Sequence, residues 1–174
     1  IADEIWHPLE LASKAPGIWY GDHTLQPGQE GQFQFLALAL DVTEELIKAE
    51  TALSVGTFNP PSAKRLSSNQ VLLYLPAHSF ANEAVVAILP TAMPTPGPDL
   101  VPLSPAYAIH SPQHYQPRDK SRISMPLPAA QHTERVALYR WNARGDRWIF
   151  AGAEKDAGHI SAPLEQLGVY SLLE

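Results

Sequence analysis

The sequence predicts an all-β protein built as an antiparallel β-sandwich, and three observations lead to this prediction. Short apolar segments recur along the second half of the chain at the spacing of sandwich strands. Seventeen prolines occur in 174 residues, about twice the usual share of roughly 5%. They cluster at 60–61, 90–105 and 112–128, where long helices cannot persist. Glycine-containing turns separate several of the segments, as antiparallel hairpins require.

The first 31 residues read as an irregular leader that could serve as an arm. They carry Trp6, Trp19 and Tyr20 among prolines and glycines that favour turns. One short strand is expected at residues 18–20. Residues 32–174 are expected to form the sandwich domain.

The segment after the leader predicts a strand followed by a short helix. Residues 32–35 alternate and continue into an apolar run that ends at Leu40, which indicates a strand entering a buried position. Residues 41–44 have the spacing of a capping box, and Val42, Leu46 and Ala49 lie at helical intervals. A helix over residues 43–50 is therefore predicted, with a β-turn leading into another strand as the alternative. Residues 55–58 can form a strand before the next prolines.

The strand pattern is clearest from residue 71 onward. Two hairpin turns are expected in this part, at residues 142–146 and 155–158, where glycine supplies the positive φ of a tight loop. The strands are predicted at residues 71–75, 85–89, 106–109, 122–125, 136–141, 148–151, 159–162 and 169–172.

Three phrases in residues 71–128 resemble ZU5-like, Ig-like β-sandwich modules. The first is an aliphatic-Pro-x-x-x-aromatic step from Leu75 to Phe80, and the second runs from Leu103 through Pro105 and Tyr107. The third is residues 123–128, which are similar to the closing strand of such a module. The glycine pair that usually opens the module is replaced by residues 67–69, Ser-Ser-Asn.

The remaining part, residues 135–174, is similar to a hairpin and final strand that follow such modules in bacterial surface proteins. Leu138-Tyr139-Arg140-Trp141 with Trp148 matches the hairpin, and Gly168-Val169-Tyr170 matches the final strand. The resemblance covers residues 71–173. It implies an accessory module of a secreted, periplasmic or cell-surface bacterial protein.

Composition narrows the possible functions. Apolar residues make up 45% of the chain and charged residues 17%, so a sizeable core can form. The net charge is −6 and the cations are scattered, which disfavours a nucleic-acid partner. The chain has no cysteine, so disulfides and cysteine nucleophiles are excluded. The longest apolar window, residues 33–42, is too short for a membrane span.

The sequence offers only weak candidates for a metal, ligand or catalytic site. His110 and His114 are a weak zinc pair, because proline breaks the loop between them and no H-E-x-x-H motif occurs. Tyr139, Trp141, Trp148 and Tyr170 suit core packing, with a ligand platform as the alternative. No G-x-S-x-G elbow or phosphate-binding glycine loop is present. We therefore expect no enzymatic activity and no cofactor.

Three functions remain open. The first is a non-catalytic structural or protein-interaction module within a larger assembly. The second is carbohydrate or cell-wall binding by Trp6, Trp19 and Tyr20, which requires exposed, flat rings. In the third, residues 1–31 add a strand to a partner or pack against it, so their removal would abolish assembly and leave the core folded.

Overall fold

The computed structural model describes residues 9, 11–15, 18–20, 29–40, 43, 45–68, 70–113, 115–118, 120–128 and 135–174. Every regular element among them is a β-strand, and every strand pair is antiparallel. The predicted all-β class is confirmed. No described segment is a helix with the length and apolarity needed to cross a membrane.

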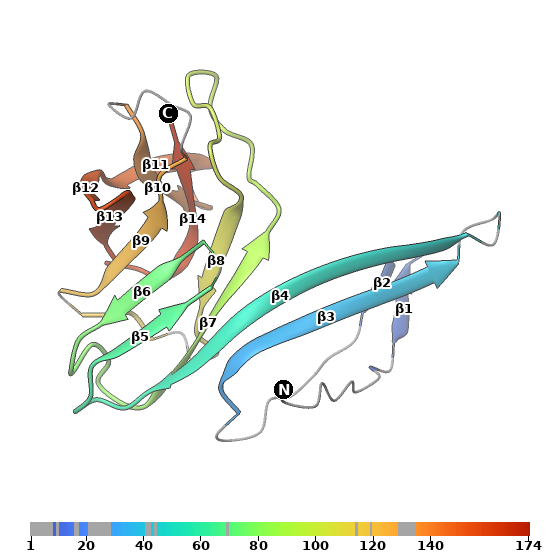
Figure 1. Cartoon of the computed structure of the whole chain (residues 1–174), viewed down its shortest axis with the longest axis horizontal. Coiled ribbons are helices and arrows are strands. Elements are labelled where there is room, and N and C mark those ends of the chain that lie inside the picture. Colours follow the sequence, from blue (N-terminus) through green and yellow to red (C-terminus); the bar gives the residue numbers. More distant parts are fainter. Residues whose placement is uncertain are drawn as a thin grey trace.

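The larger sheet has seven strands in the order β11-β10-β14-β8-β7-β4-β3. Its first and last strands in this order, β11 and β3, each pair with one neighbour among the described strands (Figure 1). The strands are β3 (Gly31–Leu40), β4 (Leu46–Phe58), β7 (Ala84–Thr91), β8 (Ala106–His110), β10 (Ala137–Asn142), β11 (Arg147–Gly152) and β14 (Gly168–Leu173).

The smaller sheet has five strands in the order β12-β13-β9-β6-β5, and a separate hairpin joins β1 to β2. The five strands are β5 (Lys64–Ser67), β6 (Leu72–Leu75), β9 (Arg122–Pro126), β12 (Glu154–Asp156) and β13 (His159–Pro163). Strands β1 (Ala12–Ala15) and β2 (Ile18–Tyr20) fall within the leader, and β2 confirms the strand predicted there.

The main hydrophobic core is shared by the two sheets, which makes the fold a sandwich. Val86 and Tyr170 from the larger sheet pack in one cluster with Leu73 and Ile123 from the smaller one. Each of these side chains is at most 1% exposed. Burial alternates along strands such as β6, β9 and β13, so one face of each points inward.

The outer faces of the two sheets differ in polarity. On the smaller sheet the outer face is polar: Ser124 lies 2.7 Å from Ser161, and the Arg65 guanidinium lies 5.8 Å from the Tyr74 ring centroid. On the larger sheet, a second cluster around Trp148 is packed against Met93 and Leu100 from the segment between β7 and β8. The proline-rich segment 92–105 therefore contributes to covering an apolar outer face.

The eight strands predicted from residue 71 onward are confirmed as β6 to β11, β13 and β14. Both predicted hairpins are present. Asn142 pairs with Arg147 across the first turn, and Asp156 pairs with His159 across the second. In that second, two-residue loop, Ala157 and Gly158 both have positive φ, at 45° and 81°, as a type I′ turn requires.

Two predictions in the first half are wrong. Residues 46–50 belong to strand β4 and not to a helix, so the alternative of a turn leading into a strand is correct. The antiparallel pairing of Leu46 with Leu40 and of its successors with β3 outweighs the local helical spacing. Strand β3 is present as predicted, but it does not enter a buried position, since Leu38 is 57% exposed.

Candidate protein-interaction surface

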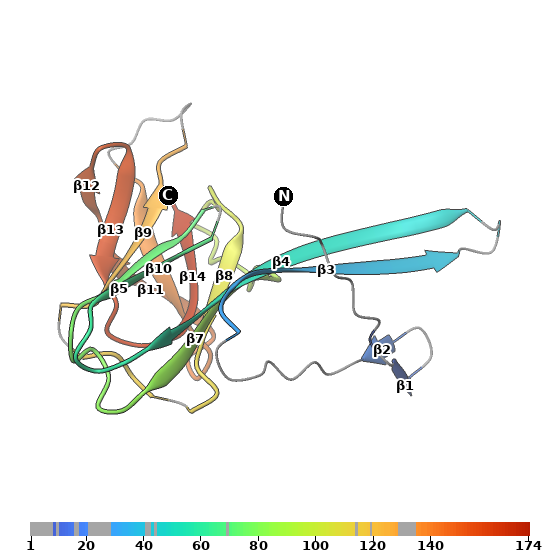
Figure 2. The same ribbon diagram turned by 60° about the horizontal axis from the view of Figure 1, so that its bottom comes forward.

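A two-stranded ribbon leaves the sandwich and extends beyond it (Figures 1 and 2). It consists of β3 and residues 46–53 of β4, and it is called the ribbon from here on. Beyond residue 53, β4 enters the larger sheet, where it pairs with β7 from Ser54 to Phe58. Within the ribbon, β4 pairs only with β3 in the described part of the chain.

The pairing register gives the ribbon one continuous apolar face. Phe33 lies opposite Leu53, and Ala39 lies opposite Ile47. Directly opposed residues of an antiparallel pair share a face, and residues two apart along a strand do so as well. The face consists of Phe33, Phe35, Ala37, Ala39, Ile47, Ala49, Thr51 and Leu53. Threonine is its one polar member.

The opposite face of the ribbon is mixed. Gln34 lies opposite Ala52, and Leu38 lies opposite Lys48. Lys48 also forms an ion pair with Glu50 along β4, and both side chains are more than half exposed. Charge on the ribbon is therefore concentrated on β4, because residues 31–40 of β3 include no charged side chain.

Large apolar side chains of the ribbon stand in solvent. On the apolar face Ile47 is 53% exposed, and on the mixed face Leu46 is 64% and Leu38 57% exposed. Phe33, Phe35 and the other apolar residues nearer to the sandwich are at best half-buried. An isolated two-stranded ribbon is marginally stable in water, and three strands or a packed face are normally needed. This surface therefore has the composition of one that is covered in use.

The base of the ribbon is fixed to both sheets by Lys64 on β5. Its ammonium donates a hydrogen bond to the carboxylate of Glu30, just before β3, and a second to the Thr57 carbonyl at 2.9 Å. The same ammonium lies 5.7 Å from the centroid of the Phe58 ring. These contacts join the start of β3 and the sandwich end of β4 to the smaller sheet.

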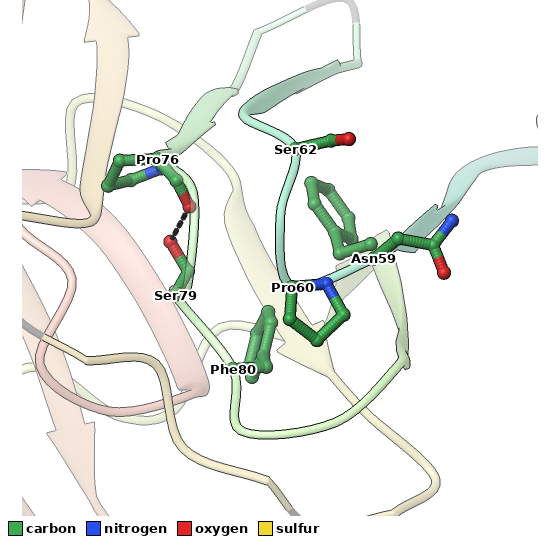
Figure 3. A pocket seen from close by; sticks show the side chains of 7 residues that line it. Asn59, Pro60, Ser62, Pro76, Ser79 and Phe80 are labelled. Carbon is green, nitrogen blue, oxygen red and sulfur yellow. Dashed lines mark hydrogen bonds between the residues drawn. The ribbon is translucent and has the colours of Figure 1, made fainter.

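Next to this base lies a shallow hollow lined by Phe58, Phe80 and the loops beside them (Figure 3). The two phenyl rings are 6.2 Å apart and tilted, and the Ser79 hydroxyl donates to the Pro76 carbonyl at 2.6 Å. The hollow leaves no volume that a water molecule could occupy. It is a packed junction at the sandwich end of β4, without room for a ligand.

A second hollow, of about 290 Å³, lies between residues 117–118 and 120–121 on one side and residues 163–165 on the other. Arg118 and Lys120 line it together with Glu165, so its charges are of both signs. Backbone hydrogen bonds from Arg118 to Ser79 and from Leu164 to Ser121 account for the loop geometry. This mixed lining selects neither an anion nor a cation.

Of the four aromatics predicted to pack in the core, Trp148 and Tyr170 are buried. Tyr170 is 1% exposed and donates to the Gln166 carbonyl at 2.6 Å, while Trp148 is 7% exposed and donates to Pro94 at 3.3 Å. Tyr139 and Trp141 are half-buried on the outer face. Their rings meet Phe150 and Trp148 edge-on or tilted, which does not present a shared flat platform to a sugar.

The remaining predicted site residues are only partly described. Trp6 and His114 lie outside the described residues, and of Trp19 and Tyr20 only the backbone in β2 is described. Carbohydrate binding by these three aromatics thus stays a prediction. His110 ends β8 with an exposed side chain. Among the described residues, no three His, Asp or Glu side chains are placed to hold one metal ion.

The ribbon was not foreseen as a site, although the sequence carries a signal for it. Residues 32–40 and 46–53 together contain apolar residues at alternate positions on both strands, including Phe33, Phe35, Ile47 and Leu53. Such alternation across a short break is typical of a hairpin. No protein-family model matches the chain, and no curated protein matches it.

Proposed function

We propose that the chain is a non-catalytic structural or protein-interaction module, and that the ribbon is its main interaction surface. The observation that carries this proposal is the continuous apolar face of the ribbon, projecting beyond a sandwich that has a complete core of its own. A sandwich does not require such a projection to fold. Exposed apolar area of this kind marks surfaces that contact other proteins.

The setting that best suits this function is a secreted, periplasmic or cell-surface bacterial protein or assembly. Support comes from the phrases in residues 71–173 that are similar to ZU5-like and Ig-like accessory modules. Part of each phrase lies on a strand of the sandwich: for example, Tyr107 is in β8, Met125 in β9 and Tyr170 in β14. A role outside catalysis agrees with a sequence that carries none of the nucleophile, metalloprotease or phosphate-binding motifs considered above.

Site-specific photo-crosslinking tests the proposal. A benzophenone amino acid is placed at Leu38 on the mixed face of the ribbon, or at Ile47 on the apolar face, in the cells that naturally make the protein. The matched control is Phe150, which is 60% exposed on the sandwich and so resembles Leu38 in size and accessibility. Protein adducts are expected from the ribbon positions and not from position 150.

Two results would contradict the proposal. Absence of adducts from both ribbon positions would show that the ribbon meets no protein. Equal labelling from position 150 would show that the adducts reflect exposure alone. Turnover of a small ester, peptide or glycan library by the purified chain would oppose its non-catalytic part.

A further inference from the structure

The two edges of the ribbon differ in a way that indicates how a partner binds. Strand β3 is the last strand of the larger sheet, so within the described part of the chain no strand pairs with its outer edge at any of its ten residues, Gly31–Leu40. The outer edge of β4 is free only over residues 46–53, because β7 pairs with it from Ser54 onward. A long strand added to β4 would meet β7, whereas a strand added to β3 would not.

The same two edges differ in charge. Proteins usually protect a free edge with lysine, other charges, proline or a bulge. Strand β4 has Lys48 and Glu50 in its exposed part, whereas β3 has no charge, no proline and an unbroken register with β4. Alternate residues of β3 direct their backbone N–H and C=O groups away from β4. The β3 edge is thus open to strand addition.

We propose that a second copy of this chain occupies this edge, with β3 of each copy paired antiparallel to β3 of the other. This inference rests on the proposed function of the ribbon and names its partner. The result is a four-stranded sheet in the order β4-β3-β3-β4, related by a twofold axis. Such a pairing is isologous, and twofold dimers are the commonest closed assemblies.

Geometry favours the second copy. In an antiparallel pair the Gly31 end of one β3 lies beside the Leu40 end of the other, so the two sandwiches stand at opposite ends of the shared sheet. Each ribbon projects beyond its own sandwich (Figures 1 and 2), so this pairing keeps the two bodies apart. Four strands also exceed the three that an independently stable sheet needs.

Side-chain chemistry also favours a second copy of the chain as the partner. A register that sets Phe35 or Leu36 on the twofold axis brings odd-numbered residues of one β3 opposite odd-numbered residues of the other. The apolar face with Phe33 and Phe35 then runs unbroken across all four strands. Since β3 has no charged residue, no like charges face each other across the new pair.

The absence of cysteine makes a direct test possible. Single cysteines are introduced as Phe35→Cys, Leu36→Cys and, as a control, Thr51→Cys, which lies opposite Phe35 on β4. Near the twofold axis, at least one of the first two variants is expected to form a covalent dimer on mild oxidation. The two β4 strands are three strand spacings apart, roughly 14 Å, which is beyond the reach of a disulfide. Thr51→Cys is therefore expected to remain uncrosslinked.

The unmodified protein gives the second measurement. Sedimentation of the full chain is expected to show a reversible shift from 19.1 kDa toward twice that mass as concentration rises. Leu38→Lys places a charge on the β3 edge, and we expect it to raise the dimer dissociation constant by roughly tenfold or more. Ala52→Lys, on the same face of the ribbon but on β4, is expected to leave it unchanged.

The outcomes separate this inference from the proposed function. A chain that stays at 19.1 kDa, or a Thr51→Cys variant that crosslinks in place of the β3 variants, overturns the pairing of two β3 strands. If photo-crosslinking at Leu38 then still captures a different protein, the proposed function stands and only its partner changes. If Leu38 and Ile47 capture nothing and the chain is monomeric, both proposals fail.

Discussion

Lys64, on the edge strand of the smaller sheet, donates a hydrogen bond to the carboxylate of Glu30, the residue that precedes β3. The same ammonium bonds to the Thr57 carbonyl on β4 at 2.9 Å. One cation thus holds both strands of the ribbon where they leave the sandwich. The ion pair in this contact depends on the charge of Glu30.

Acid is expected to weaken the base of the ribbon. The hydrogen bond from Lys64 is the main cause that lowers the pKa of Glu30, and partial desolvation opposes it. A lowered pKa in the folded state stabilises the fold above the unfolded pKa of about 4.3, and the contribution is lost as pH falls through the folded pKa. Glu30→Gln should lower the free energy of unfolding by less than about 1 kcal/mol at pH 7, since the pair is partly exposed.

Urea unfolding at neutral and acid pH measures this effect. The difference between the wild type and Glu30→Gln is expected to disappear in acid. Asp99→Asn removes an exposed carboxylate from the segment between β7 and β8 and is the control. An equal loss of stability in both variants would indicate a general effect of charge and not the contact with Lys64.

Alkali is expected to destabilise the fold through Tyr170. Burial raises the pKa of its phenol well above the ordinary value, while nearby Arg140 opposes the shift. A raised folded pKa gives full stability below the unfolded pKa of about 10, and that stability is lost as pH rises further. Burial also raises the pKa of Tyr107, which acts in the same direction.

Tyr170→Phe should therefore lose less stability than the wild type as the pH rises into the alkaline range. At pH 7 the same variant should be less stable by about 1 kcal/mol, because the hydrogen bond to the Gln166 carbonyl is gone. Tyr74→Phe, at a ring 38% exposed to solvent, is the matched control. If Tyr170→Phe loses stability at alkaline pH just as the wild type does, then other groups cause that loss.

Gly152 is expected to tolerate no side chain. It ends β11 where the chain passes from the larger sheet to the smaller one, and a Cβ built there would lie 2.8 Å from the Ala162 Cβ and 3.1 Å from its Cα. Gly152→Ala should destabilise the sandwich by about 1–3 kcal/mol, as overpacking does. Gly97→Ala adds the same methyl group where nothing lies within 4 Å. Equal melting temperatures for the two variants would contradict this account.

The sandwich is expected to fold without the ribbon. Replacing residues 33–53 by Asn-Gly joins Gln32 to Ser54, which already lie opposite each other, and Asn-Gly is suited to a two-residue hairpin loop. Core residues such as Ile123 and Leu138 are untouched. Circular dichroism and thermal unfolding should show a cooperative β-protein of similar stability. Loss of the cooperative transition would mean that the ribbon is part of the fold and not an appendage.

The strands from residue 71 onward were predictable because their apolar residues are bounded by turn and proline signals. In the two larger sheets, two edge strands were not predicted: β5, Lys64–Ser67, and β12, Glu154–Asp156, are rich in charge and resemble loops. Charges protect exposed strand edges. The same charges make these two strands resemble loops in the sequence, so the strands could not be predicted.

The ribbon shows a different limit of sequence reasoning. The spacing of Val42, Leu46 and Ala49 fits a helix. Leu46 and Ala49 nevertheless lie in a strand, because they pair with residues of β3, which precedes them in the chain. Alternation also cannot say whether a hairpin lies inside a sheet or beyond it. That depends on where β7 stops pairing with β4, at Ser54 and Ile88, which no local pattern records.

The ion pair between Lys48 and Glu50 bears on how far assembly can proceed. A hairpin with two open sides would offer a fresh edge after each addition, and growth would continue into a fibre. Here only β4 carries charges, and in the sheet of two copies a β4 strand forms each outer edge. Both outer edges are therefore protected by charge. The two charged residues on β4 thus favour an assembly of fixed size over an endless one.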